Sequence, residues 1–179
     1  MKISWRMKWL LWWTTLKKNK QHEKLVKIGQ GGSGANSILF LLPAEKETAQ
    51  VVAHLVKRDM ENENRQIRYV IHQNGLPFYP ENLKPYIITY SDDDLNWWGT
   101  LKSFSVLDRI KTTNYDALVD MNLTINPTLM FLAANLDIPI KIGFQSSFAE
   151  EFYTMVIQQS SSGFFENNYE TIERVLGLS

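Results

Sequence analysis

A chain of 179 residues, 44% hydrophobic and 21% charged, is long and apolar enough for one globular domain with a buried core. The absence of cysteine excludes disulfide scaffolds, thiolate metal centres and cysteine nucleophiles. The three histidines, His22, His54 and His72, lie too far apart in sequence for the usual spacing of zinc ligands, so we expect no metal, and nothing in the sequence implies a cofactor.

The formal net charge of zero conceals two oppositely charged parts. Residues 1–27 contain eight Lys or Arg residues and a single acidic residue, Glu23, whereas the rest of the chain contains eleven basic and eighteen acidic residues. This division indicates a basic segment that has a partner of its own. The acidic body attached to it is not expected to bind nucleic acid.

The basic segment is also rich in tryptophan and is predicted to form an amphipathic helix over residues 1–27. Its longest apolar run, residues 9–13, has five residues, far fewer than the roughly twenty needed to span a bilayer. Tryptophan and cationic side chains together favour an anionic membrane surface, which implies a cytoplasmic protein held on the inner face of the membrane. Docking on its own domain, a partner protein or a second copy would bury the same face. The predicted membrane contacts, which share one side of the helix, are Trp5, Trp9, Trp12 and Trp13.

The glycines that follow have the spacing of a dinucleotide-binding fingerprint, at Gly29, Gly31 and Gly34. That fingerprint needs a strand before the glycines and a helix after them. Here the glycines are followed by the apolar run Ile38–Leu42, which predicts a strand. We therefore interpret residues 28–37 as a flexible connector, with a phosphate-binding loop as the alternative.

From Ile38 onward, short apolar runs alternate with helical patterns, which predicts an α/β domain over residues 38–179. The expected architecture is a single Rossmann-like, doubly wound and mainly parallel sheet. The predicted strands cover residues 38–42, 67–72, 86–90, 117–121 and 140–144. The predicted helices cover residues 45–59, 98–111, 127–136, 148–158 and 169–176.

In such sheets, ligands bind beyond the carboxyl ends of the strands, which here means the loops 43–47, 91–94 and 122–126. The aspartates of the second loop could hold a hard cation, but their position favours a helix cap. The third loop supplies a polar cluster at the end of a buried strand. Its candidate ligand-binding residues are Asp120, Asn122, Thr124 and Asn126. Asn126 also precedes Pro127 as an N-cap would.

Three segments together resemble glycosyltransferase family 9, the heptosyltransferase-like enzymes. They are "YIITYSDDD" from Tyr86, "YDALVDMNLTINPTLMFLAANLDIPIKIGF" from Tyr115 and "NYETIERVLGLS" from Asn168. The similarity covers residues 37–179 and corresponds to the N-terminal half of a two-domain GT-B enzyme. The resemblance implies an acceptor-side domain linked to the synthesis of a bacterial cell-envelope polysaccharide such as lipopolysaccharide.

The sequence departs from that family where its catalytic aspartate would stand. In the family, a Gly-Asp pair follows the first strand and the aspartate acts as base, whereas this chain has Leu-Pro-Ala-Glu-Lys-Glu from Leu42. Glu45 and Glu47 are the candidate replacements. The resemblance also places the donor-binding domain after Ser179, so we expect no autonomous catalysis. The alternative is a non-catalytic, membrane-associated interaction or scaffold protein.

Overall fold

The computed structural model describes residues 35–59, 65–102, 106–158 and 165–177, together with Trp5 and Trp9. Both of these tryptophans are helical. Trp12, Trp13 and the predicted connector glycines lie outside the described residues. Ala35, which the sequence assigned to the connector, is buried, and its N–H donates to the carbonyl of Leu176 at 3.0 Å.

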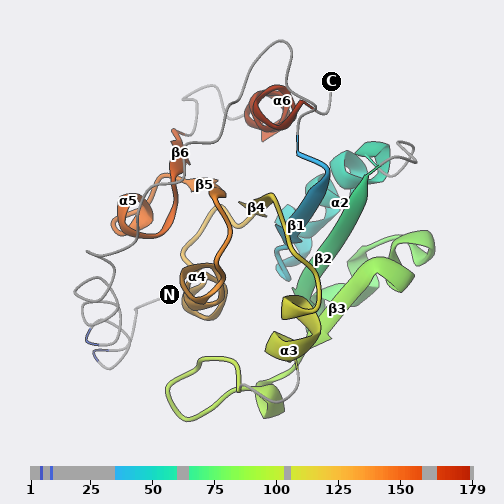
Figure 1. The fold of residues 1–179 in the computed structure, drawn as a ribbon. Coiled ribbons are helices and arrows are strands. Elements are labelled where there is room, and N and C mark those ends of the chain that lie inside the picture. Colours follow the sequence, from blue (N-terminus) through green and yellow to red (C-terminus); the bar gives the residue numbers. More distant parts are fainter. Residues whose placement is uncertain are drawn as a thin grey trace.

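The described strands form one six-stranded sheet in which every named pair is parallel (Figure 1). The strand order is β3-β2-β1-β4-β5-β6, the order of a doubly wound Rossmann-like sheet. The predicted fold class is therefore confirmed. The strands are β1 (Ser37–Leu41), β2 (Gln66–His72), β3 (Ile87–Tyr90), β4 (Ala117–Asp120), β5 (Ile140–Phe144) and β6 (Met155–Ile157).

Helices cover both faces of the sheet, with α2 and α6 on one side and α3, α4 and α5 on the other (Figure 1). The α-helices are α2 (Lys46–Asp59), α3 (Val106–Lys111), α4 (Pro127–Asn135), α5 (Ala149–Phe152) and α6 (Phe165–Leu176). The 3₁₀ helices are η1 (Gln73–Phe78), η2 (Glu81–Tyr86) and η3 (Asp92–Asp94). The two 3₁₀ helices η1 and η2 occupy the segment before β3, where the sequence predicted an irregular loop, and each contains a proline.

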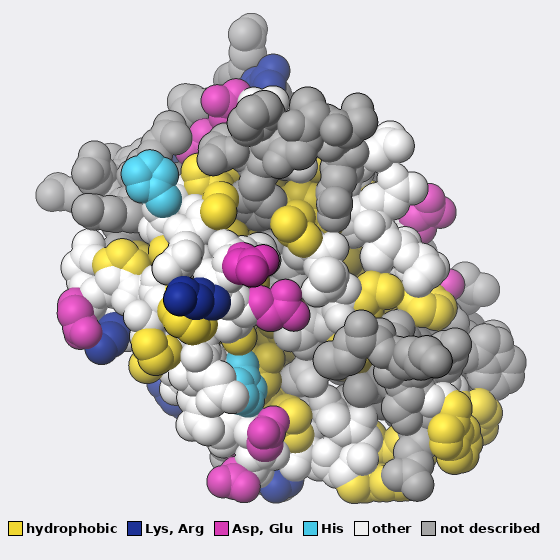
Figure 2. Space-filling view, turned by 180° about the vertical axis from the view of Figure 1, so that it is seen from behind, with side chains coloured by type: hydrophobic (Ala, Val, Ile, Leu, Met, Phe, Trp, Pro, Cys, Tyr) yellow, Lys and Arg dark blue, Asp and Glu magenta, His cyan; other side chains and the backbone are white. Residues whose placement is uncertain are grey.

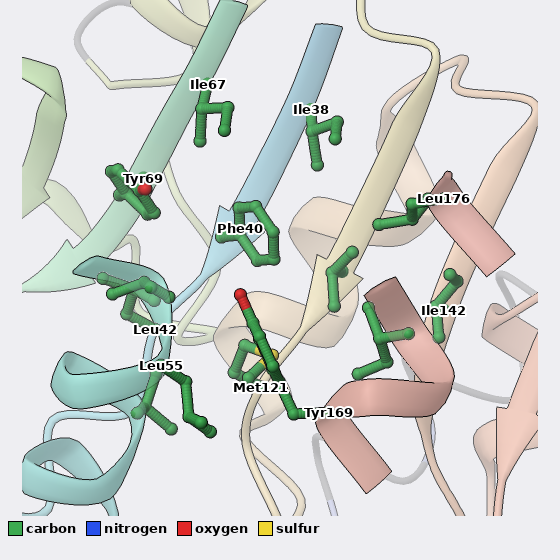
Figure 3. Packing of buried hydrophobic residues seen from close by; sticks show 14 of the residues in the cluster. Ile38, Phe40, Leu42, Leu55, Ile67, Tyr69, Met121, Ile142, Tyr169 and Leu176 are labelled. Carbon is green, nitrogen blue, oxygen red and sulfur yellow. The ribbon is translucent and has the colours of Figure 1, made fainter. Parts of the chain in front are cut away.

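The two helical layers produce two hydrophobic cores. All five residues of β1 are buried, because this central strand faces a core on each side. On the α2 and α6 side, Tyr169 of α6 projects toward Phe40 and Met121 (Figure 3). On the other side, Leu39 and Leu41 of β1 pack with the apolar residues of α4. The central strand thus anchors both layers.

The sheet reverses its direction of progress between β1 and β4. After β1 the chain enters α2 on one face, and after β4 it enters α4 on the opposite face. The loops leaving these neighbouring strands therefore diverge, which creates a crevice at the carboxyl edge of the sheet. This crevice locates the candidate site.

The predicted helix over residues 98–111 is wrong in its first half. Residues 95–101 form a tight antiparallel turn closed by a bridge between Leu95 and Leu101, and α3 begins at Val106. The Asn96 side chain accepts from the N–H groups of Trp98 and Thr100, and this local bonding competes with helix formation. Gly99 has φ of 78°, which a helix cannot accommodate.

The predicted helix over residues 148–158 is also wrong. Only Ala149–Phe152 is helical, and Met155–Ile157 forms the sixth strand, paired with β5. Periodicity alone cannot distinguish a helix from a strand in an apolar run this short. Residues 155–157 form a strand because they pair with β5 at the edge of the sheet.

The surface of the described residues carries charges of both signs. Figure 2 shows Lys and Arg side chains scattered over one face among acidic and hydrophobic ones. Among the described residues, no helix combines the length and the hydrophobicity needed to cross a membrane.

Candidate functional site

A shallow hollow opens at the carboxyl edge of the sheet, beside the point where β1 and β4 diverge. It is open to solvent, and its enclosed part has room for about one water molecule. The four candidate ligand-binding residues predicted from the sequence all line it. The complete lining, from the loop after β4, helix α4, β5 and the segments around α5, is Asp120, Asn122, Leu123, Thr124, Ile125, Asn126, Met130, Phe144, Ser146 and Tyr153.

Asp120 ends β4 and is buried, with 3% of its surface exposed. Its Oδ1 accepts from the backbone N–H of Asn122 at 3.0 Å and from Asn122 Nδ2 at 2.7 Å. Its Oδ2 accepts from the Tyr153 hydroxyl at 2.5 Å. Burial raises the pKa of the Asp120 carboxyl above its usual value, and the hydrogen bonds from Tyr153 and Asn122 oppose that rise. Both oxygens are therefore engaged within the protein.

Tyr153 reaches Asp120 by lying across β5 at Gly143. A Cβ built on Gly143 would stand 2.4 Å from Cε2 and 2.5 Å from Cδ2 of the tyrosine ring. Only glycine leaves room for the ring at this position. Sequence reasoning missed Tyr153, and the signal that could have revealed it is this glycine in the middle of an otherwise apolar strand.

The side-chain amides of Asn122 and Asn126 line the hollow beside Asp120. Asn126 is the N-cap of α4, as predicted, and its Oδ1 accepts from the Leu129 N–H at 3.3 Å. Its side chain also lowers the pKa of the nearby Tyr90. Burial nevertheless raises the pKa of Tyr90 to about 12, and the negative charges of Asp120 and Asp92 raise it further. Tyr90 is therefore a neutral hydroxyl at physiological pH.

The loop after β1, where the family 9 base would stand, is covered by the chain itself. The Tyr79 hydroxyl donates to the Pro43 carbonyl at 2.9 Å, and a Cβ on Gly75 would lie 2.6 Å from Ala44 Cα. Helix η1 is thus packed directly onto this loop. Glu45 and Glu47 are exposed around the start of α2 and do not line the hollow.

The aspartates after β3 cap η3. Asp94 Oδ2 accepts from the backbone N–H of Ser91 at 2.8 Å and from its hydroxyl at 3.0 Å, a capping box. Asp92 Oδ1 lies 3.4 Å from His72 Nε2 without hydrogen-bond geometry. Within the described ranges, no three His, Asp or Glu side chains gather in a metal-binding arrangement.

A family model matches residues 11–176, which is most of the chain. The chain belongs to DUF6913, a family of unknown function. Among curated proteins, none matches the sequence significantly. The match begins within the basic segment, so this family includes part of that segment as well as the whole sheet.

The solved structures that are similar to this DUF6913 chain share its fold at low sequence identity. A glycosyltransferase of family 9 from Veillonella parvula has a TM-score of 0.54 and 16% identity, and the similarity covers 80% of this chain and 42% of the transferase. The chain thus spans less than half the length of that enzyme. A mutant PPC decarboxylase has a TM-score of 0.47 and 14% identity, covering 76% of this chain and 95% of the decarboxylase. The FMN-binding protein AtHal3 has a TM-score of 0.37 and 18% identity over 78% and 77% of the two chains.

Replacing Tyr153 by phenylalanine should lower the free energy of unfolding by about 1 to 3 kcal/mol, because the buried Asp120 carboxyl loses a hydrogen-bond partner. Gly143→Ala should cost at least as much, because its methyl group displaces the same ring. Urea denaturation measures both, with Tyr86→Phe as the control, since that residue is exposed. Equal stability of Tyr153→Phe and the control would contradict the bond to Asp120.

The raised pKa of Asp120 makes stability depend on pH. The native state holds its proton more tightly than the unfolded state, so the contribution of Asp120 to stability is full below the ordinary carboxyl pKa and is lost as pH rises through the raised value. Relative to Asp120→Asn, the wild-type protein should therefore lose stability as pH rises through the range above the ordinary carboxyl pKa of about 4. Thermal midpoints of both proteins across this range test the sign, and parallel curves would contradict it.

Proposed function

We propose that this chain is an acceptor-side sugar-binding domain similar to that of family 9 glycosyltransferases, without catalysis by its own residues. The observation that carries the proposal is the hollow beside the topological switch point, whose polar lining consists of hydroxyl and amide groups together with the internally bonded Asp120. The resemblance of residues 37–179 to the family, and the fold shared with the Veillonella parvula enzyme, support the choice of ligand class.

The chemistry of the lining suits a neutral, hydroxyl-rich ligand. Thr124 is exposed and Ser146 is half-buried, so their hydroxyls can exchange hydrogen bonds with a ligand. Met130 and Phe144 are buried and form the apolar floor of the hollow. The one carboxylate in the lining, Asp120, already accepts three hydrogen bonds, which disfavours a role as ligand base.

The candidate bases on the loop after β1 are poorly placed for catalysis. A general base must lie within hydrogen-bond reach of the proton that it removes. Glu45 and Glu47 are exposed outside the hollow, and Tyr79 fixes the loop that precedes them. Glutamates at the first turn of α2 are accounted for by the helix dipole.

Calorimetric titration of the full chain with neutral hexoses and heptoses should show roughly millimolar binding, as befits a small and shallow site. Thr124→Val combined with Ser146→Ala should weaken it about tenfold, because two ligand hydrogen bonds are lost. Thr171→Val is the matched control, since its hydroxyl bonds within α6, to the Asn167 carbonyl. Absence of sugar binding would refute the proposed ligand.

The same protein incubated with a panel of nucleotide sugars should neither hydrolyse nor transfer the sugar. Turnover that Glu45→Gln or Glu47→Gln abolishes would show instead that a glutamate after β1 replaces the family's aspartate. Because binding and turnover are measured separately, each half of the proposal can fail alone.

A second candidate function, attachment to an anionic membrane surface, is favoured by the exposure of the two described N-terminal tryptophans. Trp5 is 74% and Trp9 50% exposed, and both are helical, four residues apart. Exposed tryptophan beside many cationic residues is typical of an interfacial helix. As an interaction protein, the chain would then present its sheet domain at the membrane.

Full-length protein should co-sediment with anionic vesicles at low salt and dissociate as salt screens the headgroups. Trp5→Ala with Trp9→Ala should reduce the bound fraction, whereas Tyr86→Ala, which removes an exposed aromatic residue outside the segment, should not. No sedimentation at low salt would remove the membrane candidate and leave the sugar-binding proposal untouched.

A further inference from the structure

The turn between η3 and α3 displays a pair of tryptophans on a rigid scaffold. We call residues 95–101 the tryptophan hairpin. The Asn96 amide donates to Thr100 Oγ1 at 2.7 Å, and its carbonyl accepts from the N–H groups of Trp98 and Thr100. Thr128 of α4 donates to the Gly99 carbonyl at 2.8 Å, which ties the hairpin to the body. A turn held this way loses little conformational freedom when something binds to it.

The hairpin presents aromatic rings together with negative charge. Trp97 is 67% exposed, and its ring centroid lies 4.0 Å from that of the half-buried Trp98. The adjoining helix η3 contributes Asp92, whose side chain is 90% exposed, and the exposed Asp93. Lys102 is close by, and its ammonium donates to the backbone carbonyl of Asp93 at 2.7 Å, so one cation accompanies the two exposed carboxylates.

Aromatic faces beside carboxylates select for cations, because the ring quadrupole and the carboxylate charge attract the same group. The chain already contains one contact between a cation and an aromatic ring, since the Arg68 guanidinium lies 5.8 Å from the centroid of the Tyr86 ring. Anionic surfaces are disfavoured at the hairpin for the same reason. The fitting partner is therefore a basic segment.

We propose that the tryptophan hairpin, with Asp92 and Asp93, is a docking surface for the basic N-terminal segment, residues 1–27, of the same chain. Charge complementarity selects this occupant: the segment has eight Lys or Arg residues and one Glu, while the rest of the chain is acidic. Linkage within one chain also gives the segment a high effective concentration at the surface.

The segment is long enough to reach the hairpin. Residues 28–34 join it to Ala35, beside the amino end of β1, whereas the hairpin follows the carboxyl end of β3. A five-residue strand spans about 16 Å, and even a fully helical segment of 27 residues would extend about 40 Å. Docking would cover the exposed tryptophan and would keep the cationic segment on the body when no other anionic surface is present.

Zero-length carbodiimide coupling of the full chain tests this, because it joins a carboxylate to a lysine amine only where the two are in contact. Without vesicles and at low salt, mass spectrometry should identify links from Asp92 or Asp93 to lysines of residues 1–27. Trp97→Ala, which leaves both carboxylates in place, should lower their yield by roughly threefold to tenfold. High salt should lower it as well.

Asp137→Asn provides the matched control. Asp137 is also an exposed aspartate, but it precedes β5 and therefore lies at the amino ends of the strands, whereas the hairpin lies beyond their carboxyl ends. That variant should leave the links unchanged, whereas Asp92→Asn with Asp93→Asn should abolish them. Absence of the links, or an undiminished yield in Trp97→Ala, would overturn the proposal. Links between isotope-labelled and unlabelled copies would also overturn it, in favour of docking on a second copy. Folding of each variant is checked by its thermal midpoint.

Discussion

The hydrogen bond from the Tyr153 hydroxyl to Asp120 holds together the edge of the sheet on which the candidate site is built. It joins the end of β4 to the segment between α5 and β6, and it crosses β5 over Gly143. A carboxylate removed from water must be matched by donors, and here Tyr153 and Asn122 supply them. The loop after β4 therefore has a defined shape, and the groups left for a ligand are uncharged.

The two sides of the crevice differ, because the side next to β1 is filled by the chain itself and the side next to β4 is open. On the β1 side, Tyr79 and the close approach of Gly75 to Ala44 fill the space that a phosphate-binding loop would need. On the β4 side, Asn126 starts α4 and lines a hollow that is open to solvent. A ligand at this edge would accordingly contact the β4 and β5 loops, without the helix N-terminus that follows β1.

Local sequence signals were sufficient for much of this architecture. Apolar runs located five of the six strands, and the order of elements was enough to infer the parallel sheet and the polar cluster from Asp120 to Asn126. The contact with Tyr153 was beyond such reasoning because it joins residues 33 positions apart. The tryptophan hairpin and β6 were mistaken for helix because Asn96 bonding and edge pairing override periodicity in short segments. The similarity to a solved structure at 16% identity extends to the fold and does not identify the residues that would bind a ligand.

The pairing of β1 with β4 bears on how the chain folds as it is synthesised. Ile38 pairs with Ala117, so one edge of the fully buried strand β1 lacks its partner until about 80 further residues have been made. At roughly 5–20 residues per second, ribosomal synthesis leaves that strand edge open for roughly 4 to 16 s. During this interval β2 and α2 can shield only the other edge and one face. The central strand thus has an unpaired apolar edge for longer than a strand that pairs with its immediate successor.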